Sequence, residues 1–265
     1  MAALCPAGHA AEGVPDFEHV VVIVFENKEE SQVIGAAAAP TFTALARRYA
    51  RLTAYYAVTH PSLPNYVALV SGGTQGIHDD CTACIVAAPN LADSLDAAGR
   101  SWKTYAEGLP RPGFTGAFAG RYAKKHVPFL YFRDIASSPV RRQGVVPLTR
   151  LRADLQGNTL PDFALVVPDL CHSMHDCSVD AGDRWLARTI PPLLKLPNTV
   201  VFVIFDEGTV RNHVPALAAG TAVRPATRLT VRSGHYSLLR TIEDAWRLPR
   251  LGASARARPI TGIWR

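Results

Sequence analysis

The stretch that decides the fold is Val20-Val-Val-Ile-Val-Phe25, six apolar residues in succession that lead directly into Glu26 and Asn27. A strand that is apolar on both faces is typical of the buried interior of a parallel sheet. Two more strands of this kind are predicted at Phe163–Val167 and Val200–Phe205. Three such strands, separated by long segments, indicate a parallel sheet whose connections contain helices.

Helical spacing and helix-end signals predict the intervening helices. They fall at Pro40–Ala50, Asn65–Val70, Asn90–Ala98, Ala181–Leu194 and Tyr236–Trp246. The segment Gly108–Arg142 is rich in Pro, Gly and Arg and is interpreted as a long functional loop or an insertion. No linker divides the chain, so we expect one α/β domain over residues 17–265, preceded by a flexible N-terminal extension over residues 1–16.

The composition excludes several classes of protein. The chain has 265 residues, of which 48% are hydrophobic and 19% charged, which excludes a disordered chain. No apolar run approaches the roughly 18–20 residues that span a bilayer. The net charge of +6 is explained by an Arg-rich solvated surface or by a surface that attracts anionic substrates. No nucleic-acid-binding motif is present, so we expect no nucleic-acid partner, and we expect a monomer.

The five cysteines bear on the compartment of the protein. We expect two local disulfides, Cys81–Cys84 and Cys171–Cys177, which leave Cys5 unpaired. A redox pair at Cys81 and Cys84, or a zinc site that adds Cys171, His172 and Cys177, are the alternatives. Disulfides imply an oxidising compartment, so a secreted or periplasmic location is expected, although residues 1–13 do not have the features of a signal peptide.

Polar side chains follow each of the three buried strands. Glu26 and Asn27 follow the first, a run that contains Asp169, His172, His175 and Asp176 follows the second, and Asp206 and Glu207 follow the third. Ligands of open parallel sheets bind beyond the carboxyl ends of the strands, so these side chains should converge. Carboxylates that lie so close repel one another unless a cation holds them, and a divalent metal is the simplest remedy. Three ordinary capped loops, with no shared ligand, are the alternative.

A second motif is Thr59-His60-Pro61-Ser62-Leu63-Pro64-Asn65-Tyr66, in which two prolines bracket a serine just before a predicted helix. The free N–H groups at a helix start favour an anion, so Ser62 is a candidate nucleophile in a field that stabilises its alkoxide. A plain N-cap serine without chemistry is the alternative.

Taken in order, these motifs resemble the phosphoesterase family, which includes bacterial acid phosphatases and phospholipases C within the alkaline phosphatase superfamily. SapM-type secreted acid phosphatases are the most similar type. The resemblance spans nearly the whole chain from His19 and rests on an ordered set of short motifs. They are Glu26-Asn27, Thr59-His60-Pro61-Ser62, Pro64-Asn65-Tyr66, Lys125-His126-Val127-Pro128, Met174-His175-Asp176, Asp206-Glu207, His235-Tyr236 and Pro259-Ile260-Thr261-Gly262-Ile263-Trp264.

The resemblance implies an alkaline phosphatase-like α/β/α sandwich and a role for each matching residue. It implies that Ser62 is a nucleophile that becomes phosphorylated and that His126 and His175 contact the transferred phosphoryl group. His60 and Asn65 would bind substrate, with the Asn65 amide donating to a phosphoryl oxygen. Thr59 is a rival nucleophile, and His172 is an added metal ligand or a loop residue. The implied ligands of the metal are Glu26, Asn27, Asp206 and Glu207.

The function that follows is a metal-dependent phosphomonoesterase with a phosphoserine intermediate. By the same resemblance, phosphatidylinositol 3-phosphate at a membrane surface is the leading substrate, ahead of other phosphomonoesters. One divalent ion is expected, and the mostly oxygen ligand set suits Ca²⁺, Mg²⁺ or Mn²⁺, with Zn²⁺ as an alternative. Two other functions are weighed against it: a phospholipase C-type phosphodiesterase and a non-catalytic secreted protein that binds a metal or an anion.

Overall fold

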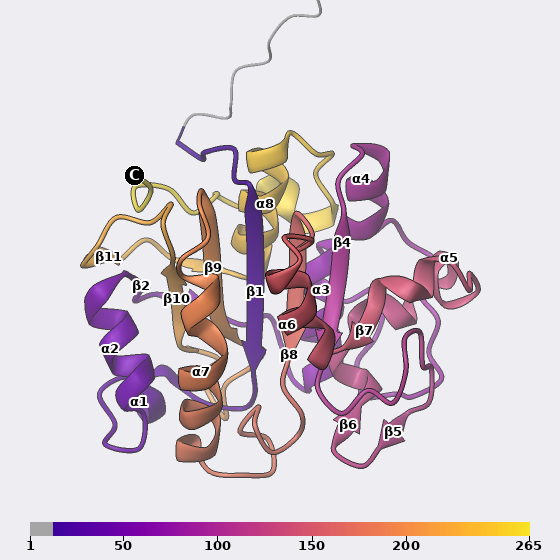
Figure 1. Ribbon diagram of the computed structural model, residues 1–265, viewed down its shortest axis with the longest axis horizontal. Coiled ribbons are helices and arrows are strands. Elements are labelled where there is room, and N and C mark those ends of the chain that lie inside the picture. Colours follow the sequence, from indigo (N-terminus) through magenta and orange to yellow (C-terminus); the bar gives the residue numbers. More distant parts are fainter. Residues whose placement is uncertain (1–12) are drawn as a thin grey trace, which may run out of the picture.

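The computed structural model describes residues 13–265, and within them eight strands form one central sheet in the order β11-β2-β10-β9-β1-β8-β4-β7. Strand β1 (His19–Phe25) lies in the middle and pairs in parallel with β9 (Thr199–Phe205) and β8 (Phe163–Val167) (Figure 1). The other five strands are β2 (Ala50–Leu52), β4 (Trp102–Ala106), β7 (Val145–Pro147), β10 (Ala216–Ala219) and β11 (Thr227–Leu229).

The sheet is mostly parallel, as predicted. Only β10 runs against its neighbours, β9 and β2, while every other pair in this sheet is parallel. Two small two-stranded sheets lie outside it: one joins β3 (Tyr55–Tyr56) to β12 (Ser233–Gly234), and the other joins β5 (Phe118–Ala119) to β6 (Tyr122–Ala123).

Helices cover both faces of the sheet and complete the predicted α/β/α sandwich. One face carries α2 (Pro40–Arg48), α6 (Thr149–Gln156) and α7 (Val179–Leu193), and the other carries α3 (Ser62–Ser71) and α8 (His235–Trp246) (Figure 1). The shorter helices are α1 (Glu30–Val33), α4 (Leu91–Ala97), α5 (Arg133–Ala136) and the 3₁₀ turns η1 (Lys124–His126), η2 (Pro128–Tyr131), η3 (Arg141–Gly144) and η4 (Gly252–Arg256). No helix among residues 13–265 is both long and apolar enough to cross a membrane.

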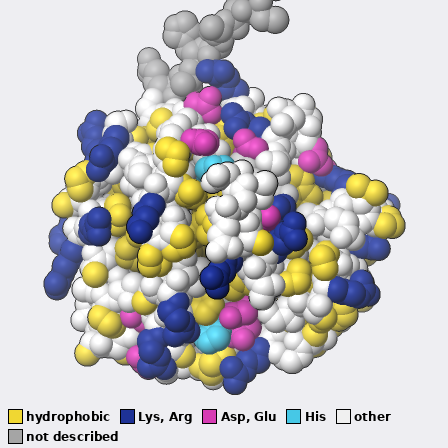
Figure 2. Space-filling view, in the orientation of Figure 1, with side chains coloured by type: hydrophobic (Ala, Val, Ile, Leu, Met, Phe, Trp, Pro, Cys, Tyr) yellow, Lys and Arg dark blue, Asp and Glu magenta, His cyan; other side chains and the backbone are white. Residues whose placement is uncertain are grey.

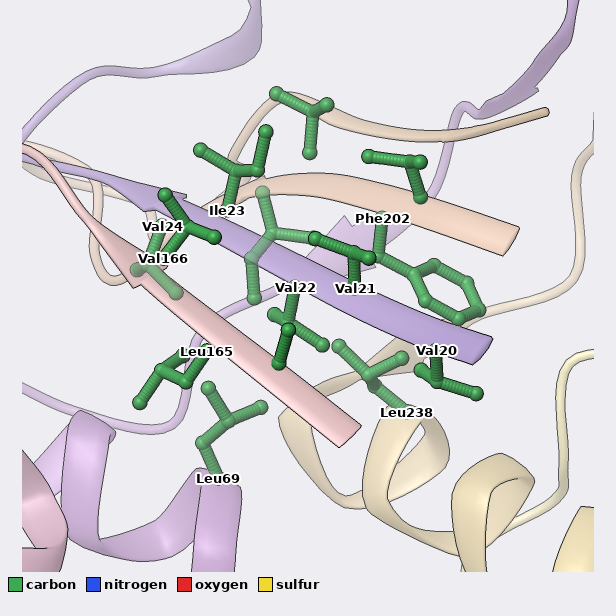
Figure 3. Packing of buried hydrophobic residues seen from close by; sticks show 14 of the residues in the cluster. Val20, Val21, Val22, Ile23, Val24, Leu69, Leu165, Val166, Phe202 and Leu238 are labelled. Atoms are coloured by element: carbon green, nitrogen blue, oxygen red, sulfur yellow. The ribbon is translucent and has the colours of Figure 1, made fainter. Parts of the chain in front are cut away.

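The core forms around β1, because each side chain from Val20 to Phe25 is at most 1% exposed. Leu69 of α3 and Leu238 of α8 pack beneath this strand (Figure 3). Full burial of a side chain of this size stabilises the fold by about 1.5–3 kcal/mol. The strand that leads into Glu26 is therefore packed tightly on both faces.

The predicted elements differ from the observed ones chiefly at their ends. The three predicted strands are β1, β8 and β9, and the five predicted helices are α2, α3, α4, α7 and α8. The largest difference is that α3 begins at Ser62 and not at Asn65. Pro64 lies in the first turn of this helix, where the missing N–H of a proline removes no intrahelical hydrogen bond.

The segment Gly108–Arg142, predicted as a long loop or an insertion, is built from short elements that pack into the core. It contains β5, β6, η1, η2 and α5, and the side chains from Phe129 to Phe132 are all buried. Most of the predicted N-terminal extension, residues 1–12, lies outside the described residues, as does Cys5. Within residues 13–16, the Val14 side chain is buried in the core.

Both predicted disulfides are present. Cys81 is bonded to Cys84, with 5.8 Å between their Cα atoms, and Cys171 to Cys177, with 4.7 Å between theirs. These bonds leave no thiolate among the four cysteines for the alternative zinc site.

Gly72, which ends α3, provides a test of how tightly this helix packs against the backbone of Leu251. Its φ is +71°, and an added Cβ would lie 1.9 Å from the Leu251 carbonyl oxygen. Gly99 has a similar φ of +68°, with no atom within 4 Å of an added Cβ. We expect Gly99→Ala to lower the free energy of unfolding by about 1–2 kcal/mol, the cost of the left-handed conformation.

Gly72→Ala should cost clearly more, because backbone atoms must also move. Chemical denaturation of the two variants measures the difference directly. An equal loss in both would show that the contact between Gly72 and Leu251 relaxes freely.

Candidate active site

Three acidic side chains meet one serine at the carboxyl ends of β1 and β9. Glu26 directly follows β1, Asp206 and Glu207 directly follow β9, and Ser62 approaches from the first turn of α3. The Ser62 Oγ donates to Glu26 Oε2 at 3.0 Å and lies 3.3 Å from Glu207 Oε1. All four side chains are buried, at most 5% exposed. The convergence expected from the parallel sheet is therefore observed for these residues.

Burial and mutual repulsion make these carboxyl groups reluctant to ionise. Burial, followed by the charge of Asp206, raises the pKa of Glu26 well above its usual value. Burial, followed by the charge of Glu207, raises the pKa of Asp206 to about 7. Burial also raises the pKa of Glu207 to about 7. Ionising several neighbouring buried acids costs free energy. A bound cation would lower this cost by stabilising their charged forms.

The donor set fits a divalent cation. Asp206 Oδ1 accepts from the backbone N–H groups of Asn27 at 3.2 Å and Glu207 at 2.6 Å, while the buried Oδ2 has no hydrogen-bond partner among residues 13–265. A buried acceptor without a partner is uncommon in a folded protein and needs an explanation. Asn27, a predicted ligand, has a φ of +57°, and its side chain makes no hydrogen bond within the described residues.

Asn65 holds the loop that carries the serine. Its Oδ1 accepts from the backbone N–H groups of Val58 and Thr59, both at 3.0 Å. Its Nδ2 donates to the carbonyls of Thr59 at 2.8 Å and Pro61 at 3.0 Å. Both protons of the amide are thus used, so the prediction that Asn65 donates to a phosphoryl oxygen finds no free donor. The side chain instead fixes residues 58–61 against α3.

The start of α3 also differs from the expected set of free N–H groups that would favour an anion. The Leu63 N–H donates to Asp80 Oδ1 at 2.9 Å, and Pro64 has no N–H to offer. The first turn therefore has fewer free donors than an ordinary helix start.

The predicted histidines lie at different depths. His126, in η1, is 1% exposed, and its Nε2 lies 3.3 Å from Glu26 Oε2. Burial, followed by the charges of Lys125 and His175, lowers its pKa well below the usual value, so the ring is neutral. His60 is more open, with a side chain 45% exposed, and its Nδ1 lies 2.7 Å from Glu207 Oε2. The side chain of His175 is 29% exposed, and its ring centroid lies 5.9 Å from that of His126.

Four further residues complete the site, although they are not among the predicted site residues. Three of them, Tyr66, Lys125 and His235, lie in motifs quoted for the resemblance. The Tyr66 hydroxyl donates to Glu26 Oε1, and Tyr66 lies four residues after Ser62 on the same face of α3, a spacing that could have revealed it. Lys125 Nζ donates to Asp80 Oδ2 at 2.7 Å and lies 3.2 Å from His175 Nε2. Its place in the quoted motif Lys125-His126-Val127-Pro128 was the available signal.

Asp80 belongs to none of the quoted motifs, whereas His235 is part of the motif His235-Tyr236, for which no role was predicted. Asp80 joins Lys125 to the backbone of α3 across a separation of 17 residues from Leu63. His235 is buried, and its Nε2 donates to the Asp206 backbone carbonyl at 2.7 Å. Burial lowers the pKa of His235 to about 4, so this ring stays neutral while it anchors the end of β9.

His172 lies in a separate cluster. Its Nδ1 lies 2.9 Å from Glu107 Oε2 and 3.4 Å from Asp169 Oδ1, at the carboxyl ends of β4 and β8. Ligand atoms of the three residues lie within 4.8 Å of one another. None of the three is hydrogen-bonded to Ser62 or to the carboxylates around it.

Comparison with known proteins identifies the family of the chain. The model of the family described as "Phosphoesterase family" matches residues 32–249. The chain is 37% identical to a phosphatidylinositol-3-phosphatase of Mycobacterium tuberculosis, covering 97% of this chain and 86% of that protein. It is 32% identical to an acid phosphatase of Aspergillus fumigatus, covering 82% of this chain and 53% of the fungal protein.

The fold has counterparts among solved structures. A protein of the alkaline phosphatase superfamily from Vibrio parahaemolyticus matches with a TM-score of 0.63 at 13% identity, covering 94% of this chain and 73% of that one. At this identity the likeness concerns the fold alone, and it confirms the predicted alkaline phosphatase-like architecture. The match to the family model over residues 32–249, together with the 37% identity to the mycobacterial protein, shows that this chain belongs to the phosphoesterase family.

Proposed function

We propose that the protein is a metal-dependent phosphomonoesterase that acts through a phosphorylated Ser62. The single observation that carries the proposal is the Ser62 hydroxyl, buried and within 3.3 Å of two carboxylates at the end of the sheet. Its named relatives are phosphatases, which supports an enzyme over a non-catalytic binding protein. A serine surrounded by acids is suited to nucleophilic attack, because a carboxylate can accept its proton.

The reaction would proceed in two displacements. In the first, Ser62 Oγ forms a bond to phosphorus, the ester P–O bond breaks, and the serine proton passes to a neighbouring carboxylate. In the second, water attacks the phosphoserine, inorganic phosphate leaves, and the serine regains a proton. Glu26, Asn27, Ser62, Asp206 and Glu207 would hold the cation, which would neutralise their charge and favour the ionised serine oxygen.

The solvent exposure of each histidine indicates which role it can take in the reaction. The leaving group must depart towards solvent, so the acid that protonates its oxygen should lie on the open side of the site. His60 and His175 satisfy this condition, whereas His126 is closed off and neutral. His126 is suited to hydrogen-bond a phosphoryl oxygen, since its Nε2 has no hydrogen-bond partner within the described residues. Lys125 supplies a positive charge beside His175.

The proposed substrate is a phosphomonoester, with phosphatidylinositol 3-phosphate as the leading candidate because of the mycobacterial relative. The net charge of +6 would draw the protein to anionic lipid. Lys125 is hydrogen-bonded to His175, a predicted catalytic residue. Among the described residues, no other lysine or arginine side chain between 121 and 142 has such a bond. Lys124 donates to the Thr82 carbonyl, and Arg141 pairs with three aspartates. The disulfides support a secreted or periplasmic location.

Ser62→Ala should abolish turnover of p-nitrophenyl phosphate and of lipid-embedded phosphatidylinositol 3-phosphate, by about 10³-fold or more, while the fold survives. Thr59→Val is the matched control, because the Thr59 hydroxyl donates only to the His60 carbonyl at 3.3 Å within the described residues. Initial rates on both substrates measure the effect.

Retention of most activity by Ser62→Ala, with loss in Thr59→Val, would transfer the nucleophile to Thr59.

For wild type, rising salt should lower the rate on the lipid substrate more steeply than the rate on p-nitrophenyl phosphate, because ions screen attraction to the membrane surface. Absence of phosphate release from the lipid would leave a phosphatase of soluble esters.

The raised pKa values of Asp206 and Glu207 predict how stability depends on pH. Without a cation, the folded chain keeps protons up to about pH 7 that the unfolded chain releases near 3.8 and 4.5. The stabilising contribution is full below those values and is lost as the pH rises to about 7. A divalent cation replaces these protons, so it should raise Tm more at pH 8 than at pH 5.

At a cation concentration of about 100 Kd the stabilisation is about 2.7 kcal/mol, or roughly 5–10 °C in Tm for a chain of this size. Thermal scans of chelator-treated protein with added Ca²⁺, Mg²⁺, Mn²⁺ or Zn²⁺ measure it, with Glu26→Gln as the variant that should respond less. If no cation shifted Tm at either pH, the proposed ligand set would be wrong.

A further inference from the structure

A cavity of about 370 Å³ lies at the outer edge of the sheet, between α2 and the edge strand β11. Its volume lies within the roughly 300–1,000 Å³ typical of small-molecule sites. β10 separates its strands, β2 and β11, from β9 and β1, which carry the catalytic cluster. Three arginines from three different elements line it, together with small and polar residues, and we call it the arginine pocket. Its arginines are Arg47, Arg51 and Arg228.

The charge of the arginine pocket is not balanced within the described chain. Arg47 and Arg228 are exposed, and neither makes an ion pair or a side-chain hydrogen bond with any of residues 13–265. The lining includes no aspartate or glutamate. Basic side chains gather over α2 and β11 on the left of the molecular surface (Figure 2). Like charges brought together in this way repel one another until an anion joins them.

Arg51 provides a fixed point in the pocket. Its Nε and Nη2 donate to the buried Glu30 at 2.8 and 2.5 Å, which holds the guanidinium in place. Its Nη1 has no hydrogen-bond partner among the described residues. Thr43 of α2 also lines the pocket, and its Oγ1 accepts from the Gly35 N–H at 2.9 Å, so its own proton is available to a ligand. A pre-positioned guanidinium loses less conformational entropy on binding than a free one.

We propose that the arginine pocket is a second, non-catalytic site that binds a phosphate group. Guanidinium groups match the geometry of phosphate oxygens and can bind them in pairs. Apart from Ile34 and two alanines the lining is polar or glycine, which favours a compact dianion over an apolar acid. The phosphate can belong to a soluble ester, to inorganic phosphate or to the headgroup of an anionic lipid. The proposal does not depend on the catalytic role of Ser62.

The test uses the full chain with Arg47→Gln and Arg228→Gln combined. The control combines Arg256→Gln and Arg258→Gln, which remove two exposed arginines that are also unpaired within residues 13–265 and lie outside the pocket. Isothermal titration with inorganic phosphate should show one binding event weakened by about tenfold or more in the pocket variant only. Turnover of p-nitrophenyl phosphate, and its inhibition by phosphate, should be unchanged in both variants.

Vesicle flotation distinguishes the source of the phosphate. Vesicles of phosphatidylcholine, with and without phosphatidic acid, are compared for wild type and both variants. Loss of binding to phosphatidic acid in the pocket variant alone would identify a lipid headgroup as the ligand. If only inorganic phosphate binding falls, the ligand is soluble. Unchanged phosphate affinity in the pocket variant, or an equal loss in the control, would overturn the proposal.

Discussion

The structure depends on one constraint: three carboxyl groups are buried around a single serine hydroxyl, where their charges oppose one another. Glu26 and the pair Asp206 and Glu207 reach this place because β1 and β9 are parallel neighbours and end together. The apolar strands make the arrangement unavoidable, since their burial fixes where the acids must lie. Protons or a cation would stabilise such a site, and in the proposed function the cation-bound state would assist phosphoryl transfer.

The surrounding contacts keep the serine in register with these acids. Asn65 ties residues 58–61 to the helix, Asp80 holds the Leu63 N–H, and His235 anchors the Asp206 carbonyl. Each contact uses a buried or half-buried polar group that would otherwise lack a partner, so each also stabilises the fold. Asp80 directly precedes the Cys81–Cys84 disulfide, which restrains the loop that carries it. Positioning and stability therefore involve the same residues.

The central strands of the sheet were easier to predict from the sequence than the short strands near one edge. The apolar runs of β1, β8 and β9 are long enough to identify, whereas β2 and β11 have three residues each, too few to show a pattern. The predicted start of α3 lies three residues too late, because the helix was expected to open just after Pro64, although a proline is tolerated in a first turn. The prediction of a flexible N-terminal extension stays a prediction, because most of that segment lies outside the described residues.

The candidate site was predictable where its residues follow a strand or share a motif. Glu26, Ser62, Asp206 and Glu207 were found in this way, and the structure brings them together. Asp80 was not found, and His235 was quoted in a motif without its role, because both roles depend on contacts across the fold that leave no periodicity in the sequence. Asn65 lay in the right motif, yet its partners are backbone groups whose positions only the folded loop reveals.

The most direct test of the central claim is the metal content of purified protein, measured by mass spectrometry beside turnover of p-nitrophenyl phosphate. The account predicts about one divalent cation per chain in wild type, with metal and activity both lost in Asp206→Asn, because this change removes a charged ligand. Equal metal content in the two proteins, or full activity in wild type stripped of metal, would contradict it.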